Sequence, residues 1–147
     1  MEEQQLKALV DSVIKYFAIN PLGDVSVGSP YLVETDEAEK GEHLSGTIGI
    51  SGSKHGWLRY SAPKIMIKHL LLSMGESDTS DANVADMIGE VANTISGNLR
   101  KEFGAEFIIS IPKVETKLEV SGEDKERRYV VPIYWKQYNS SVVIYLG

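Results

Sequence analysis

Three stretches of the chain place apolar residues three or four positions apart, which is the spacing of an amphipathic helix. The first covers residues 3–19 and ends at the turn-forming sequence Asn-Pro-Leu-Gly. The second begins at Pro63, a residue favoured in the first turn of a helix, and ends near Gly75. The third follows segment 76–81, which is rich in N-cap residues, and continues to Phe103. The pattern therefore predicts three helices.

The segments around these helices are rich in β-branched and aromatic residues, which is typical of strands. The predicted strands are 25–33, 44–51 and 56–61 before the second helix, and 107–111, 114–120, 129–135 and 142–146 after the third. Turns are predicted at 52–55, 122–125 and 137–140. The order of helix, strands, two helices and strands favours an α+β fold. Because each half has a helix followed by about three strands, it also suggests an internal duplication within a single domain, residues 1–147.

The composition excludes several kinds of site and partner. The 147 residues contain no cysteine, which rules out disulfides, thiol nucleophiles, zinc–thiolate sites and iron–sulfur clusters. The 15 Lys and Arg residues and 21 Asp and Glu residues give a net charge of −6, which disfavours binding to nucleic acid or to an anionic membrane. No apolar run is long enough to span a bilayer, and residues 1–5 show no signal-peptide pattern. The expected location is the cytoplasm.

The third predicted helix has two faces of different character. Its apolar residues form one stripe, which must face the core: Val84, Ile88, Val91, Ile95 and Leu99. At roughly 100° per residue, a second set falls within about 60° on the opposite side: Asp86, Glu90, Asn93 and Gly97. Taken alone, this second set is usually explained as a solvated helix face.

The residues after Asp86 and Glu90 favour a functional surface instead. Segment 93–98 contains Asn, Thr, Ser and Gly, which are poor helix formers in the middle of a helix. The glycine alone should cost about 0.5–1 kcal/mol relative to alanine. A departure from helix propensity without a structural benefit is typical of a functional surface. Gly97 would also let a partner approach the helix closely.

The sequence Asp86-x-x-x-Glu90-x-x-Asn93, followed by Thr94-Ile95-Ser96-Gly97 and later by Pro112, resembles the motif of the CheC/CheX/FliY phosphatases. These proteins dephosphorylate the chemotaxis response regulator CheY. The resemblance extends over nearly the whole chain and is closest to CheX, because the first helix has only Asp11, Lys15 and Ala18 at the positions of a second motif. It implies a CheX-like fold, with an antiparallel-rich sheet, helices packed on one side and pseudo-duplicated halves.

The resemblance also implies a role for each residue of the motif. Asn93 would position the water that attacks the aspartyl phosphate, and Glu90 would pair with the lysine of the regulator's active site. Asp86, Gly97 and Pro112 would belong to the partner-binding surface. The implied partner is a phosphorylated CheY-like receiver that supplies the Mg2+ ion, so no metal ligand or cofactor is expected in this chain.

Two other functions stay open on the sequence alone. One is a non-catalytic adaptor that binds a receiver or another partner, and the other is an unrelated α+β interaction domain. A metal enzyme is disfavoured because His43, His55 and His69 are far apart and lack the spacing of metal ligands. The family resemblance further implies that a homodimer can form by joining sheet edges, and the final strand, Ser141 to Leu146, is the candidate edge.

Overall fold

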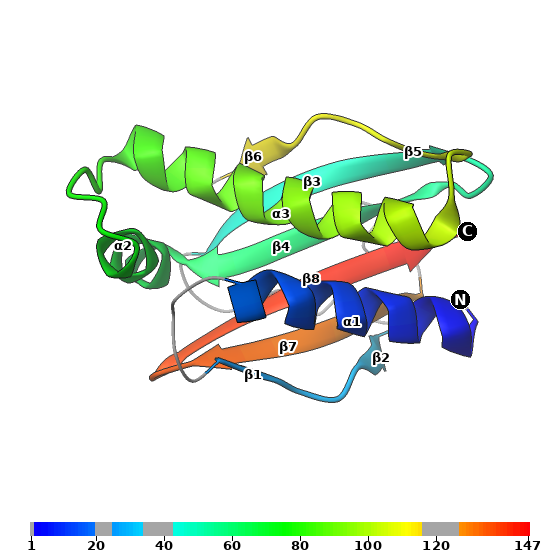
Figure 1. Ribbon diagram of the computed structural model, residues 1–147, viewed down its shortest axis with the longest axis horizontal. Helices are drawn as coiled ribbons and strands as arrows, with labels where there is room; N and C mark the ends of the chain where they lie inside the picture. The colour runs from blue at the N-terminus through cyan, green and yellow to red at the C-terminus, as the bar shows by residue number, and fades with distance from the viewer. Residues whose placement is uncertain (1, 20–24, 34–42, 116–126) are drawn as a thin grey trace.

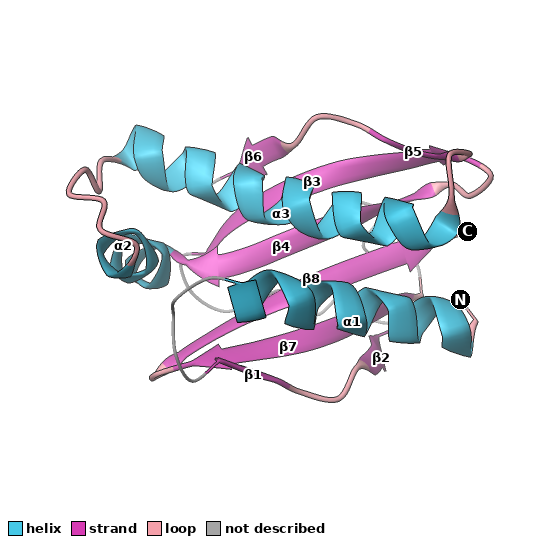
Figure 2. Ribbon diagram, viewed as in Figure 1, coloured by secondary structure: helices cyan, strands magenta, loops and turns pink. Residues whose placement is uncertain are grey.

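One antiparallel sheet carries two long helices against the same face (Figures 1 and 2). The computed structural model describes residues 2–19, 25–33, 43–115 and 127–147. Within these residues the helices are α1 (Glu3–Ile19), α2 (Lys64–Ser73) and α3 (Asp81–Phe103). The eight strands are β1 (Val25–Val27), β2 (Tyr31–Val33), β3 (His43–Gly52), β4 (Gly56–Pro63), β5 (Phe107–Ile109), β6 (Lys113–Glu115), β7 (Arg128–Trp135) and β8 (Tyr138–Leu146).

The sheet is built around two hairpins, and each hairpin pairs with short strands from the other half of the chain. The strand order is β1-β7-β8-β4-β3-β5, with β2 also paired to β7 and β6 also paired to β3. The hairpins β3–β4 and β7–β8 meet at the centre through the antiparallel β4–β8 pair. The short strands of each half therefore pair with the hairpin of the other half. This arrangement confirms the predicted α+β fold with pseudo-duplicated halves.

The core lies between the helices and the sheet. Helices α1 and α3 lie side by side over the strands (Figure 1), and both contribute fully buried apolar residues. On the sheet side the core includes Ile48, Leu58, Val131, Ile133, Val142 and Ile144. A smaller cluster of Trp57, Val130 and Val143 lies apart from this core. None of the described helices is both long and apolar enough to cross a membrane.

The prediction of an exposed final strand is wrong. Strand β8 lies in the middle of the sheet, between β7 and β4, so residues 141–146 cannot form a free edge. The strand also begins earlier than expected, at Tyr138, because the chain turns at Lys136 and Gln137. Lys136 adopts a φ of 54°, which allows this tight turn. The described sheet edges are instead formed by the short strands.

Several strand boundaries also differ from the prediction. Segment 25–33 forms two short strands separated by Gly28-Ser29-Pro30, because Pro30 has no backbone N–H for the ladder. Strand β5 ends at Ile109 rather than at Ile111. Strand β6 is described from Lys113 to Glu115, and the rest of predicted strand 114–120 lies outside the described residues. The turn predicted at 122–125 also lies outside them.

Candidate functional site

Helix α3 is held firmly at both ends. At its start the Ser80 hydroxyl accepts a hydrogen bond from the Asn83 N–H (3.3 Å), and Asp78 accepts one from the Ser80 N–H (2.9 Å). That hydrogen bond lowers the pKa of the Asp78 carboxyl. Lys64 on α2 forms an ion pair with Asp81, which lowers the pKa of that carboxyl and links the starts of the two helices. At the other end Gly104, with a φ of 93°, ends the helix.

The predicted inward stripe of α3 is confirmed. All five of its residues are at most 1% exposed: Val84, Ile88, Val91, Ile95 and Leu99. The helix approaches β3 closely because Gly46 has no side chain, and a Cβ there would lie 3.1 Å from the carbonyl oxygen of Ile88. The rotation of α3 about its axis is therefore fixed by packing, which in turn fixes the direction of its outer face.

The opposite face of α3 carries the predicted polar residues. Asp86, Glu90 and Asn93 are exposed, and Gly97 is half-buried with no atom within 4 Å of a Cβ built on it. The side chains of Glu90 and Asn93 form no hydrogen bond or ion pair with any of the described residues. The carboxylate and the amide, one helical turn apart, are thus available to a partner. In the described part of the chain, no group of three or more acidic or histidine side chains is arranged to hold a metal ion.

Three surface grooves meet at these side chains. One, of about 610 Å³, is lined by Ala85, Asp86, Gly89, Glu90, Asn93, Pro112 and Val114. A second, of about 300 Å³, lies between the end of α2 and α3 and also includes Asp86 and Glu90. A third, of about 660 Å³, extends from Asn93 along the C-terminal half of α3. Glu90 and Asn93 therefore lie where the grooves adjoin, on an open surface rather than in an enclosed pocket.

The structure brings Pro112 to this site although it is distant in sequence. Strands β5 and β6 both pair with β3, so the segment between them runs along the sheet edge beside α3. A Cβ built on Gly89 would lie 3.4 Å from the Pro112 Cγ, which shows how closely the proline approaches the helix. All five predicted site residues thus lie on one connected surface, with Gly97 in the groove beyond Asn93.

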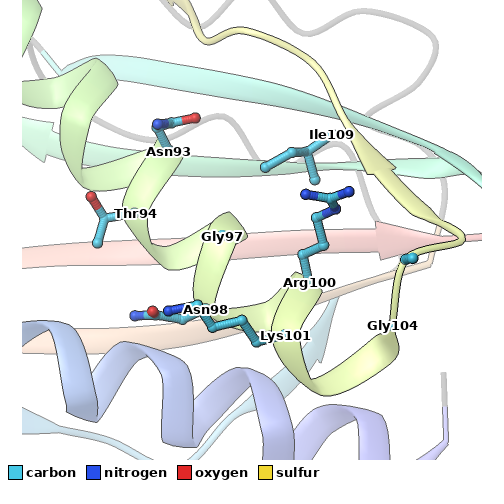
Figure 3. A pocket seen from close by; sticks show the side chains of 9 residues that line it. Asn93, Thr94, Gly97, Asn98, Arg100, Lys101, Gly104 and Ile109 are labelled. Carbon is cyan, nitrogen blue, oxygen red and sulfur yellow. The ribbon is translucent and has the colours of Figure 1, made fainter.

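The third groove contains residues that the sequence analysis did not single out. Figure 3 shows Asn93, Gly97 and Arg100 along α3, with Arg100 reaching toward Ile109 of β5. The Arg100 Nε–H donates a hydrogen bond to the Phe107 carbonyl (3.1 Å), which holds its side chain beside the strand. The spacing of Arg100 from Asn93, two helical turns, is a signal that could have found it. Ile109 reaches the groove only because β5 pairs with β3, and no local sequence pattern indicates that contact.

Comparisons with known proteins agree with this geometry. A family model described as "Chemotaxis phosphatase CheX" matches residues 44–134, more than half of the chain. No curated protein matches the chain. A CheC-like superfamily protein from Shewanella sp. PV-4 is 24% identical with a TM-score of 0.82, covering 100% of this chain and 99% of that chain. The chemotaxis protein CheX from Vibrio vulnificus is 19% identical with a TM-score of 0.82, covering 98% and 99%.

One solved structure contains a partner protein. A chain of the CheX–CheY–BeF3–Mg2+ complex from Borrelia burgdorferi is 18% identical with a TM-score of 0.77, covering 97% of this chain and 97% of that chain. At such identities these solved structures establish the fold that the chain shares with them.

Proposed function

The chain belongs to the CheX family of chemotaxis phosphatases, and we propose that it hydrolyses the aspartyl phosphate of a CheY-like response regulator by inserting Glu90 and Asn93 into the regulator's active site. The observation that carries the proposal is the exposure of these two unpartnered side chains, one turn apart, on a helix whose opposite face is fully buried. A receiver substrate also places this activity in the cytoplasm.

In this proposal Asn93 positions the attacking water. Its amide can donate one hydrogen bond and accept another, so it can hold a water in line with the phosphorus without being consumed. The water oxygen forms a bond to phosphorus while the bond to the aspartyl oxygen breaks. Inorganic phosphate leaves, the receiver's carboxylate is regenerated, and the proton lost by the water passes to the phosphate product or to solvent. Positioning accounts for most of the catalysis of such a transfer.

Glu90 sets the register of the complex. A carboxylate one turn from Asn93 can form a charge-assisted hydrogen bond with a lysine of the receiver's active site, and this contact would fix the helix over the phosphate. Asp86, Gly97 and Pro112 would extend the docking surface along the grooves. We assign the Mg2+ ion to the receiver. The presence of Mg2+ and BeF3 in the Borrelia burgdorferi CheX–CheY complex supports this assignment.

Phosphate release from phosphorylated receivers of the source organism tests the proposal. The wild-type protein should accelerate release from one of them, and Asn93→Ala should lower the rate at saturating protein by about 100-fold or more, because the water is no longer positioned. Glu90→Ala should weaken binding about tenfold or more. Glu102→Ala is a matched control, since this exposed glutamate of α3 lines none of the three grooves. Wild-type rates in both site variants would refute the assignment.

The same variants distinguish an adaptor from an enzyme. An adaptor would bind the receiver with and without Asn93 and would show no accelerated phosphate release in either form. An unrelated interaction domain would bind no receiver in either phosphorylation state.

A further inference from the structure

The connection between β5 and β6 exposes an isoleucine beside the proposed site. Ile111 is 87% exposed, the highest value among the exposed large apolar side chains of the described residues. The next residue, Pro112, lines the groove that contains Glu90 and Asn93. The backbone of Ile111 thus lies about 3.8 Å, one Cα–Cα step, from a residue that forms the groove's wall. The connection runs along the sheet edge next to α3 (Figure 1).

Hydrogen bonds hold this connection in place. The Ser110 hydroxyl accepts a hydrogen bond from the Gly49 N–H (2.8 Å) and donates one to the Ile111 carbonyl (2.9 Å). The Ser110 N–H donates to the Gly49 carbonyl (2.9 Å). On both sides the chain continues into strands that pair with β3. Ile111 is therefore presented to solvent from a fixed backbone, so little conformational entropy would be lost if a partner covered it.

The other half of the molecule provides an internal comparison. There the connection between β1 and β2 is Gly28-Ser29-Pro30, which has the same length and also ends in proline. It is attached to β7 in the same way, since the Gly28 N–H donates to the Pro132 carbonyl (2.8 Å). The position equivalent to Ile111 is occupied by Ser29. At this position of the connection, the half that carries Glu90 and Asn93 therefore has an exposed isoleucine, while the half with Lys15 and Ala18 on its helix has a serine.

We propose that Ile111 is an apolar anchor of the receiver-docking surface, packing into an apolar depression on the receiver next to its phosphorylation site. This inference rests on the proposed function. Binding surfaces concentrate affinity in a few rigid apolar side chains that become fully covered in the complex. Here the polar contacts of Glu90 and Asn93 would carry out recognition and chemistry, and Ile111 would supply apolar burial at the rim of the same groove. The anchor acts on binding and leaves the chemical step unchanged.

Ile111→Ser, which installs the residue of the other half, tests the inference. With the cognate receiver activated by beryllofluoride and Mg2+ as the probe, we expect the Kd to rise about tenfold. We expect the KM for phosphorylated receiver to rise similarly while kcat changes less than about twofold. Ile108→Ser is the matched control: Ile108 is 53% exposed on β5, the edge strand just before this connection, but alternation along β5 points it to the sheet face opposite α3. Its Kd should stay within about twofold of wild type.

The outcomes separate this inference from the proposed function. If the wild-type protein dephosphorylates the receiver and Ile111→Ser binds as tightly as wild type, the anchor is refuted and the proposed function stands. If the wild-type protein neither binds nor dephosphorylates any receiver, the proposed function itself fails. Sedimentation equilibrium covers a third outcome: a wild-type dimer that Ile111→Ser converts to monomer, with receiver affinity unchanged, would assign Ile111 to contact with a second copy and overturn the inference.

Discussion

The amide of Asn93 owes its position to residues that never reach the surface. One turn of α3 exposes Asn93, while Val91 and Ile95 on either side of it are fully buried. A helix packed in this way cannot rotate without disrupting the core, so the face on which Asn93 is presented is fixed before any partner arrives. The proposed positioning of a water by Asn93 depends on this fixed presentation.

Substitutions at Gly97 test the proposed docking surface. A Cβ at this position meets no atom within 4 Å, so the folded protein does not require glycine there. We expect Gly97→Ala to raise the free energy of unfolding by about 0.5–1 kcal/mol, because alanine is the better helix former. We expect Gly97→Gln, whose Cβ meets no neighbouring atom in the free protein, to weaken receiver binding about tenfold by filling the space that the partner needs.

Urea unfolding and receiver titration measure these two effects separately. A variant that is more stable and binds less well would show that the glycine is retained for contact with the partner. Unchanged receiver affinity in Gly97→Gln would show instead that the partner does not approach this part of the helix.

At the scale of elements, the site depends on how closely α3 lies against β3. Gly46 of β3 permits this approach, since a Cβ there would lie 3.1 Å from both the Ile88 Cγ2 and the Ile88 carbonyl oxygen. At the next residue of the helix, Gly89, a Cβ would make ordinary contacts of 3.4 Å with Pro112 and Val114, so these two residues lie directly against α3. Gly46 therefore sets how closely α3 lies against β3, and the groove beside Glu90 forms where Pro112 and Val114 lie next to the helix.

Gly46→Ala should therefore destabilise the protein by about 1–3 kcal/mol, because the new methyl group meets helix backbone that cannot move aside. Gly49→Ala is the matched control on the same strand. Its Cβ would lie 3.4 Å from the Ser110 Oγ, an ordinary contact, and we expect a change within about 0.5 kcal/mol. Urea denaturation of both variants measures the difference. Equal stabilities would mean that the contact between α3 and β3 is looser than the packing indicates.

The elements that the sequence predicts well are those whose pattern is local. The apolar period of residues 81–103 determines both the helix and its exposed face, so Glu90 and Asn93 could be found without a structure. The proximity of Pro112 depends on β5 and β6 pairing with β3, a contact between distant parts of the chain that no local pattern encodes. The prediction that the final strand lies at a sheet edge is wrong for the same reason, because its pairing with β7 and β4 joins distant parts of the chain that no local pattern encodes. Its start was missed because Tyr138, Asn139 and Ser140 have the composition of a turn.

At the scale of the whole molecule, the two halves depend on each other. Strands β1 and β2 complete the hairpin of the second half, and β5 and β6 complete that of the first. Helix α1 also packs against α3. Neither half can bury its apolar surface without the strands of the other, although only one half carries the proposed chemistry. The half without the motif therefore acts as the support for the half that has it.

Because the short strands of each half pair with the other half, we expect a single cooperative unfolding transition. The two tryptophans of the chain report on opposite halves, since Trp57 lies on β4 and Trp135 on β7, and both are buried. In the single-tryptophan variants Trp57→Phe and Trp135→Phe, the urea midpoint from fluorescence should coincide with that from far-ultraviolet circular dichroism of the same variant. Each substitution can lower stability, so the comparison is made within a variant rather than between them. A fluorescence midpoint that departs from the circular dichroism midpoint in either variant would show that the halves unfold separately and that the strand exchange does not join them into one domain.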